Sequence, residues 1–376
     1  MLTRRSVILS AAGLSLGFSS AALARPSAGA VVAPIRLEQE RVIIDAMING
    51  QGPMPFAIDT GAVVSGLEVD VARRLGLPVI RKVRLAGRPF DLYKVDELVL
   101  GGAVRQPDAA LFGLTLNLRG ANGLLAAGLV TTFDSQLDFD RLEWRVFPAG
   151  LGDTPGFEPL PSWIRQDAGS AQGSRRIGVK VMLDGQPLSL VVDTGLPKTL
   201  VLENGVGRKL GYWNDDRDYA PASSVGIAGP APRPGRVMRA RDLTIGGLRF
   251  DAPLVTVRDA PRMQQDYDGI LGLPIIERMN LSVDSRKAIL LARPSGRPAR
   301  DESVNRTGLW IDEAPGGAKV SVVGRGSPAQ AAGLKVGDRI NGPSFGAILK
   351  SLSADGPVSL DVQGRGLVSL TPRKYI

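Results

Sequence analysis

The clearest pattern in this 376-residue chain is an apolar strand–turn–strand unit that occurs twice. Residues 43–62 (IIDAMINGQGPMPFAIDTGA) and 177–196 (IGVKVMLDGQPLSLVVDTGL) each contain two apolar stretches, a short turn between them and a closing Asp-Thr-Gly. The turns are Asn49-Gly50 and Asp184-Gly185, and such pairs between apolar runs favour tight β-hairpins. The pattern therefore predicts two equivalent hairpins, each followed by an Asp-Thr-Gly loop.

The similarity between the two copies continues beyond these loops. In each copy apolar residues then follow a helical spacing, which predicts a short helix. The spaced residues are Leu67, Val71 and Leu75 in the first copy, and Leu202, Val206 and Leu210 in the second. Each helix is expected to end at a glycine, Gly76 or Gly211. Three more segments match: 98–102 with 243–247, 122–125 with 268–271, and 137–140 with 281–284. This self-similarity indicates a tandem duplication.

Composition and linkers divide the rest of the chain. The 46 glycines and 27 prolines are dispersed, which favours many short strands joined by turns and hence a mainly β fold. Gly-, Pro- and Ser-rich stretches at 149–174 and 293–306 are typical of linkers. The predicted segments are a signal peptide at 1–24, a first lobe at 31–150, a second lobe at 165–294 and a C-terminal domain at 303–376.

The first residues have the pattern of an export signal. Arg4 and Arg5 precede an apolar run at 7–18, and the small residues of 22–24 (ALA) suit a cleavage site. The paired arginines also suit a twin-arginine signal, so the general secretory and twin-arginine routes both stay open. A spanning helix needs about 20 apolar residues, so no membrane span is expected here or later. The predicted location is outside the cytoplasm, in the periplasm.

Two absent residue types restrict the chemistry. The chain has no histidine and no cysteine, which excludes Ser-His triads, thiol nucleophiles, disulfides and metal sites built on those side chains. Acid–base catalysis must then use carboxylates, lysine, tyrosine or water. The net charge is +9, but the basic residues are scattered and only 5% of residues are aromatic, so nucleic acid is not expected as a partner.

Three motifs together resemble the pepsin and retropepsin superfamily of aspartic peptidases. They are residues 56–62 (FAIDTGA), 191–195 (VVDTG) and 270–272 (ILG), within regions of roughly 35–148 and 175–293. A single Asp-Thr-Gly is a common turn, but two copies at the same place in a repeat are specific. The resemblance implies two acid-protease-like β-barrel lobes, a catalytic pair Asp59 and Asp193, a polypeptide substrate, and neither cofactor nor metal.

The implied chemistry uses one proton shared by two acids. Carboxylates about 3 Å apart cannot both ionise, so the ionised member deprotonates a water and the protonated member donates to the scissile carbonyl. By resemblance the threonines bond to the opposite loop, and the glycines let the loops approach. The residues expected to support the catalytic loops are Thr60, Gly61, Ala62, Thr194, Gly195 and Leu196.

Two positions depart from the family pattern. Leu196 stands where the family usually has Ser, Thr or Ala, so no hydroxyl can stabilise the carboxylate of Asp193. Ala126 replaces the glycine expected after two leucines, which is a milder change. The first departure keeps a second interpretation open, a catalytically weakened peptide-binding protein of the same fold. A glycosidase with two carboxylates is a further alternative, although two equivalent loops suit a shared proton better.

Each lobe is expected to contribute a hairpin that closes over the substrate. The residues at the expected tips are Ala86, Gly87 and Arg88 in the first lobe, and Gly226, Ile227 and Ala228 in the second. Ordinary surface hairpins remain the alternative.

The C-terminal segment 303–376 resembles a PDZ domain, a β-sandwich with short helices. The run 326–340 (GSPAQAAGLKVGDRI) carries the resemblance, and its Ser327 and Pro328 suit a helix start. The resemblance implies that backbone N–H groups of a loop bind the C-terminal carboxylate of a peptide. The residues of that loop are Gly308, Leu309, Trp310 and Ile311. A brace within the chain is the alternative role.

Overall fold

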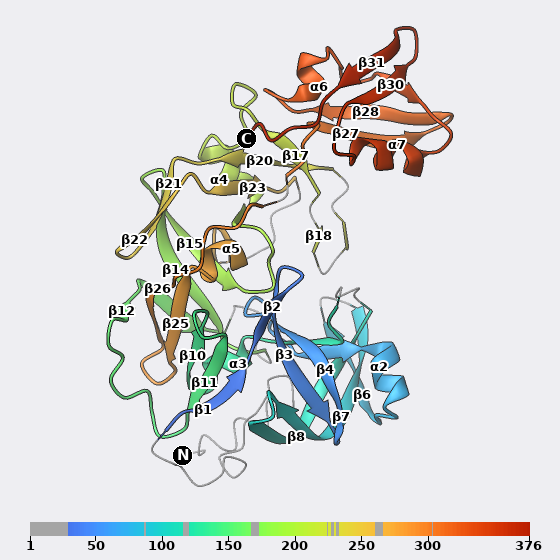
Figure 1. The fold of residues 1–376 in the computed structure, drawn as a ribbon. Coiled ribbons are helices and arrows are strands. Elements are labelled where there is room, and N and C mark those ends of the chain that lie inside the picture. Colours follow the sequence, from blue (N-terminus) through green and yellow to red (C-terminus); the bar gives the residue numbers. More distant parts are fainter. Residues whose placement is uncertain are drawn as a thin grey trace. The chain divides into compact units, whose positions relative to one another are not determined.

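The structure is a computed structural model that describes residues 29–376 except 86–87, 116–119, 167–172, 224, 227–228, 231–232, 260–265 and 303. The predicted signal peptide therefore lies outside the described residues. The fold is mainly β, as expected (Figure 1). No helix of the described residues is long and apolar enough to cross a membrane. The chain divides into two compact units, the first formed by 1–199, 244–250 and 265–300, and the second by 200–243, 251–264 and 301–376.

The first repeat forms an eight-stranded sheet in the order β2-β3-β4-β9-β5-β8-β7-β6. The Asn49-Gly50 turn joins β3 to β4, and both residues have positive φ, which confirms the predicted hairpin. Strand β3 also pairs with β7, so the sheet curls back on itself. The elements are β2 (Arg36–Glu38), β3 (Arg41–Ile48), β4 (Gln51–Ile58), β5 (Gly66–Glu68), α2 (Val69–Arg74), β6 (Val79–Leu85), β7 (Arg88–Leu100), β8 (Val104–Leu114), β9 (Gly123–Leu125) and α3 (Gly128–Thr131).

The second repeat places an equivalent hairpin in the same unit. The Asp184-Gly185 turn joins β14 to β15, and β15 pairs in parallel with β24 as β4 does with β9. Strand β13 pairs with β14 on its other edge. The elements are β13 (Ser162–Arg165), β14 (Arg176–Leu183), β15 (Gln186–Asp193), β24 (Gly269–Gly272) and α5 (Leu273–Ile276).

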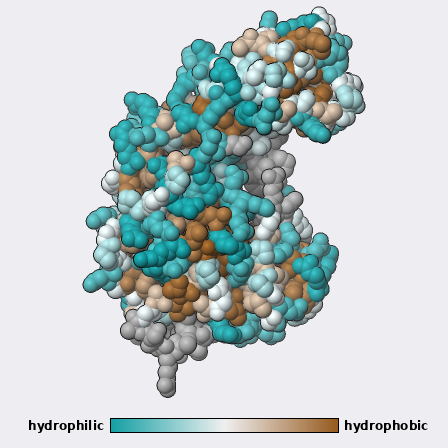
Figure 2. Space-filling view, in the orientation of Figure 1, coloured by the Kyte–Doolittle hydropathy of each residue, from teal (hydrophilic) through white to brown (hydrophobic). Residues whose placement is uncertain are grey.

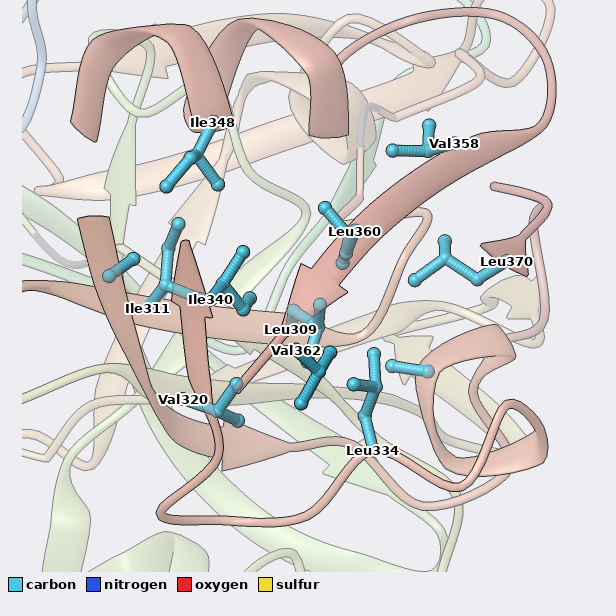
Figure 3. Close-up of a cluster of buried hydrophobic side chains, with 12 residues drawn as sticks. Leu309, Ile311, Val320, Leu334, Ile340, Ile348, Val358, Leu360, Val362 and Leu370 are labelled. Atoms are coloured by element: carbon cyan, nitrogen blue, oxygen red, sulfur yellow. The ribbon is translucent and has the colours of Figure 1, made fainter. Parts of the chain in front are cut away.

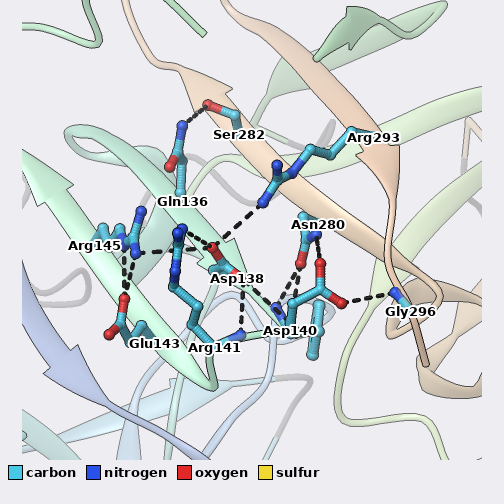
Figure 4. Close-up of polar contacts among 11 residues, drawn as sticks. Gln136, Asp138, Asp140, Arg141, Glu143, Arg145, Asn280, Ser282, Arg293 and Gly296 are labelled. Carbon is cyan, nitrogen blue, oxygen red and sulfur yellow. Dashed lines mark hydrogen bonds and ion pairs between the residues drawn. The ribbon is translucent and has the colours of Figure 1, made fainter. Parts of the chain in front are cut away.

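A six-stranded sheet in the order β1-β11-β10-β25-β26-β12 joins the two repeats. Its central pair consists of the matching strands of the two copies, with Leu137 opposite Leu281. The buried Asn280 of β25 joins this strand to the residues just after β10: it accepts from the N–H of Phe139 at 2.7 Å and donates to Asp140 at 2.6 Å (Figure 4). The elements are β1 (Val31–Pro34), β10 (Asp134–Asp138), β11 (Glu143–Phe147), β12 (Glu158–Pro159), β25 (Met279–Asp284) and β26 (Ile289–Pro294).

The second unit combines part of the second repeat with the C-terminal segment. In the repeat part, β23 pairs with β16 and β20, and β20 pairs with β17. The elements are β16 (Leu200–Leu202), α4 (Asn204–Lys209), β17 (Ala220–Ala222), β18 (Val225–Gly226), β19 (Gly229–Pro230), β20 (Gly235–Arg239) and β23 (Leu254–Val257). Two further strands lie at the division between the units, β21 (Asp242–Ile245) and β22 (Leu248–Asp251).

The C-terminal segment has its own sheet and its own apolar core. Five strands follow in chain order, and the buried side chains drawn in Figure 3 fill the space between this sheet and two helices. Ser327 caps the first helix by accepting from the N–H of Gln330, as predicted. The elements are β27 (Leu309–Ala314), β28 (Gly317–Val323), α6 (Pro328–Ala331), β29 (Arg339–Asn341), α7 (Phe345–Leu352), β30 (Val358–Val362) and β31 (Gly366–Leu370). We call residues 304–376 the C-terminal module; its likeness to a PDZ domain stays a prediction.

Two expectations about local structure were wrong in detail. The helices α2 and α4 end before Gly76 and Gly211 as predicted, but Leu67 and Leu202 belong to the preceding strands. The expected linker 149–174 contains β12 and β13, because both find partners in neighbouring sheets.

Exposed apolar side chains are spread along the chain. The large ones include Val79, Met182, Val336 and Leu367. Hydrophobic residues form separate patches between hydrophilic ones on the face shown in Figure 2. This view therefore gives no continuous apolar surface to which a function can be assigned.

Candidate active site

The two Asp-Thr-Gly loops meet within the first unit. Thr60 donates its hydroxyl to the carbonyl of Val192 at 2.7 Å, and Thr194 donates its hydroxyl to the carbonyl of Ile58 at 2.6 Å. The N–H of each threonine in turn donates to the hydroxyl of the other, at 3.1 and 3.0 Å. Both threonines are buried. These four bonds join the ends of β4 and β15 and fix the loops in register.

The glycines of the loops permit a close approach to the opposite acid. A Cβ atom built on Gly61 would lie 2.3 Å from Cγ of Asp193, and one built on Gly195 would lie 2.6 Å from Cγ of Asp59. Real Cβ atoms do not come this close to a carboxyl group. Each glycine therefore packs against the acid of the other repeat, which brings Asp59 and Asp193 to one place.

The two carboxyl groups have unequal hydrogen-bond partners. Oδ1 of Asp59 accepts from the N–H groups of Gly61 at 3.1 Å and Ala62 at 2.9 Å. Oδ1 of Asp193 accepts from the N–H of Gly195 at 2.8 Å. The N–H of Ala62 also donates to the main-chain carbonyl of Asp59 at 3.2 Å, whereas among the described contacts the equivalent N–H of Leu196 donates to the main-chain carbonyl of Asp193 alone, at 3.3 Å. The negative form of Asp59 is therefore better stabilised.

The pKa values of both acids are raised, by different amounts. Burial raises the pKa of Asp59, while a hydrogen bond from Asp193 and the two backbone N–H groups hold it down. Burial and then the charge of Asp59 raise the pKa of Asp193 well above 3.8. Since the anion of Asp59 has more backbone donors, the single proton of the pair belongs on Asp193. Two buried carboxyl groups this close hold one proton between them.

The structure shows the contacts of Leu196 and Ala126, the two residues that depart from the family pattern. Leu196 accepts at its carbonyl from the N–H of Leu273 at 2.9 Å, so its main chain anchors the start of α5. Ala126 is buried and its N–H donates to the hydroxyl of Ser65 at 2.9 Å. The equivalent residue in the second repeat is Gly272, where a Cβ would lie 1.8 Å from the carbonyl oxygen of Lys198. The first repeat therefore has room for a methyl group at Ala126, and the second has none at Gly272.

Both predicted hairpins are present, but their tips are not described. Strands β6 and β7 pair up to Leu85 and Arg88, and Arg88 is exposed. Strands β18 and β19 pair Gly226 with Gly229. The expected tip residues Ala86, Gly87, Ile227 and Ala228 lie outside the described residues. A closing role for either hairpin stays a prediction.

The loop expected to bind a peptide carboxylate already uses some of its N–H groups. The N–H of Gly308 donates to Oδ1 of Asn305 at 2.8 Å, and that of Leu309 donates to the hydroxyl of Thr307 at 3.2 Å. The N–H of Gly324 donates to the carbonyl of Gly308 at 2.7 Å. Trp310 and Ile311 belong to β27 and pair with β28. A peptide that bound these two N–H groups would have to displace the Asn305 and Thr307 side chains.

Sequence analysis missed two residues beside the acids. Arg176 donates from Nη1 to the carbonyl of Gly61 at 3.1 Å and from Nη2 to the hydroxyl of Tyr267 at 3.2 Å. Its guanidinium also stacks over the ring of Tyr267, 5.1 Å from the centroid. The repeat gave no signal for Arg176, because the offset of 134 residues between the two copies aligns it with Val42.

Comparison with known proteins locates the likeness in both repeats. The model of the aspartyl protease family matches residues 44–125 and 179–275. Among solved structures, an aspartic proteinase from Irpex lacteus is 13% identical in sequence, with a TM-score of 0.45. The alignment covers 71% of this chain and 98% of the proteinase chain. Basic 7S globulin from soybean is 12% identical in sequence, with a TM-score of 0.44. The alignment covers 73% of this chain and 99% of the globulin chain.

No curated protein matches the chain. The two matched segments each contain one Asp-Thr-Gly loop, and the two loops meet in the structure. These observations support an aspartic-protease-like fold for the two repeats.

Proposed function

We propose that this protein is an exported aspartic endopeptidase in which Asp59 and Asp193 form the catalytic pair. The observation that carries the proposal is the reciprocal bonding of Thr60 and Thr194, which brings the two acids together. The family match in both repeats supports a peptidase. Export rests on the sequence of residues 1–24 alone.

The unequal partners of the acids give each a role. Asp59, which accepts two backbone N–H bonds, is the ionised member and removes a proton from the attacking water. Asp193 holds the proton and donates it to the oxygen of the scissile carbonyl. The attack forms a tetrahedral diol, and its collapse returns a proton to the leaving amine. Neither step needs a metal or a cofactor.

The test is cleavage of unfolded casein by the purified protein, with and without pepstatin. We expect Asp59→Asn and Asp193→Asn each to reduce cleavage by at least about a thousandfold, because either change removes the shared proton. Melting curves would show that both variants fold. Cleavage that survives in either variant would overturn the assignment.

The pH profile provides a second test of the same proposal. A bell-shaped rate profile reports the two pKa values of the pair. Both values are raised from 3.8, so the optimum should lie above pH 3.8. An optimum at lower pH would contradict the raised pKa values.

A catalytically weakened peptide-binding protein remains the second candidate. Leu196 favours it, because its side chain cannot donate to Asp193 and its N–H is used elsewhere. Binding of pepstatin without casein cleavage would support this candidate. A substrate-recruiting role for the C-terminal module is a separate proposal, and so is a peptide ligand there.

A further inference from the structure

Arg176 and Tyr267 form an unusual connection between the repeats. Arg176 is the first residue of β14, and its two Nη groups bind the carbonyl of Gly61 and the hydroxyl of Tyr267. Tyr267 is buried and lies just before β24. The ring of Tyr267 lies under the guanidinium, so the arginine is fixed by stacking as well as by hydrogen bonds.

The bound carbonyl belongs to the peptide unit between Gly61 and Ala62. The N–H of that same unit donates to Oδ1 of Asp59 at 2.9 Å, the shorter of the two bonds to this acid. A donor on the carbonyl polarises a peptide and strengthens the bond that its N–H makes. Arg176 therefore acts on Asp59 through one peptide unit.

We propose that Arg176, held by Tyr267, is a positioning residue that orients the peptide unit between Gly61 and Ala62 so that its N–H stays directed at Asp59. The inference rests on the proposed function and adds to it the residue that directs a backbone N–H at Asp59. The equivalent peptide in the second repeat, between Gly195 and Leu196, directs its N–H to a main-chain carbonyl rather than to the carboxyl group of Asp193. Both N–H groups contact the main-chain carbonyl of their own aspartate, and only that of Ala62 also donates to a carboxyl oxygen among the described contacts.

The charged groups around the pair are few in the described part of the chain. Arg41 on β3 acts on Asp59, and Arg176 on β14 acts on Asp193. Beside Tyr267, Asp266 pairs with Arg165 at 3.6 Å and Asp268 accepts from the N–H of Ser189. The positive charge of Arg176 also lowers the pKa of Asp193.

The test compares pH–rate profiles of the wild type with Arg176→Gln, Arg176→Lys and Tyr267→Phe. In Arg176→Gln both limbs should move to higher pH by roughly one unit, because both acids lose stabilisation of the negative form. Its kcat should fall by roughly tenfold, with KM little changed. Arg176→Lys keeps the positive charge but cannot bind the carbonyl of Gly61 and the hydroxyl of Tyr267 at the same time. Only the limb of the pH–rate profile at lower pH, which reports the ionisation of Asp59, should therefore move. Tyr267→Phe should give a smaller shift in the same direction.

Arg165→Gln is the matched control. Arg165 lies directly opposite Arg176 on the paired strand and also stacks on an aromatic ring, that of Trp163, at 4.5 Å. It has no bond to an Asp-Thr-Gly loop among the described contacts, so its profile should match the wild type. If Arg176→Gln fails to fold, Arg176→Lys and Tyr267→Phe decide the question.

A readout independent of catalysis separates this inference from the proposed function. NMR titration of the aspartate carboxyl carbons should show both acids of the pair titrating at higher pH in Arg176→Gln than in the wild type. Unchanged titrations and profiles in a protein whose cleavage still needs both acids would overturn the inference alone. If replacing Asp59 or Asp193 did not affect cleavage, the proposed function would be wrong. The NMR titration would still test the effect of Arg176 on the two acids.

Discussion

At the scale of single residues, the raised pKa values of the acid pair have a cost for folding. A carboxyl with a raised pKa binds its proton more tightly in the folded state, so stability falls as pH rises through that pKa and the loss is complete above it. Asp193, with its pKa raised well above 3.8, should therefore destabilise the fold at neutral pH. Such a cost is typical of a functional site rather than of a structural one.

Asp193→Asn should accordingly raise the melting temperature at pH 7 by a few degrees, since a kcal/mol shifts it by roughly 2–4 °C in a domain of 150–250 residues. The gain should vanish near pH 3, where the wild type is protonated. Asp140→Asn is the control, because it should lower the melting temperature at pH 7 rather than raise it. Burial raises the pKa of Asp140, but bonds from Asn280 and Gly296 outweigh this and lower it, so its replacement should destabilise at pH 7. A pH-independent effect of Asp193→Asn would contradict this account.

The same scale shows what sequence reasoning could and could not reach. The positions of Asp59 and Asp193 follow from a repeated three-residue motif, and the structure brings the two copies of that motif together. Arg176 and Tyr267 were missed because their roles depend on contacts across 115 and 91 residues of chain. No local periodicity reports such contacts. Trp163 is similar: it packs on Gly178, where a Cβ would lie 2.0 Å from the indole, yet the surrounding composition suggested a linker.

At the scale of elements, the hairpins β3–β4 and β14–β15 were predictable because turn chemistry is local. Each needs two residues with positive φ, which Asn-Gly and Asp-Gly pairs supply. The boundary between β5 and α2 was not predictable from apolar spacing, because Leu67 is buried in a strand and continues the helical pattern by coincidence. The pairing of β10 with β25 likewise depends on the duplication as a whole rather than on either strand.

The loops after β4 and at the end of β15 should behave as one cooperative unit. Thr60→Val and Thr194→Val each remove a hydroxyl that donates and accepts, leaving a buried carbonyl and a buried N–H without that partner. Each should cost roughly 2–4 kcal/mol of unfolding free energy. Because the two hydroxyls belong to one set of four bonds that joins the same two loops, the double variant should lose less than the sum. Urea unfolding of the four proteins measures this coupling, with Thr60→Ser expected to retain most of the stability. Strict additivity would mean that the loops are held independently.

At the scale of the whole molecule, the C-terminal module shares the second unit with strands of the second repeat. Tyr219, just before β17, donates its hydroxyl to the carbonyl of Val323 at 3.1 Å, and Tyr375 donates to the carbonyl of Tyr219 at 2.8 Å. On β20, Nη2 of Arg239 donates to the main-chain oxygen of Ile376 at 3.2 Å, and Arg236 stacks over the Tyr219 ring at 4.1 Å. Strands β17 and β20 lead into and out of the segment containing β18 and β19. The module is therefore attached to both stems of the second predicted closing hairpin.

This attachment predicts that the module braces the hairpin whether or not it binds a peptide. A Cβ on Gly324 would lie 2.3 Å from the carbonyl oxygen of Tyr219 and 2.7 Å from the Tyr375 hydroxyl, so Gly324→Ala should loosen the contact without altering the core of the module. Gly346→Ala is the matched control, because Gly346 has no neighbour within 4 Å of the built atom. Hydrogen exchange should accelerate at the amides of β17 and β20 in Gly324→Ala and stay unchanged in Gly346→Ala. Cleavage of short peptides and of casein should then fall together, since a loosened hairpin affects every substrate. A rise in KM for casein alone, with exchange unchanged, would instead assign the module to substrate recruitment.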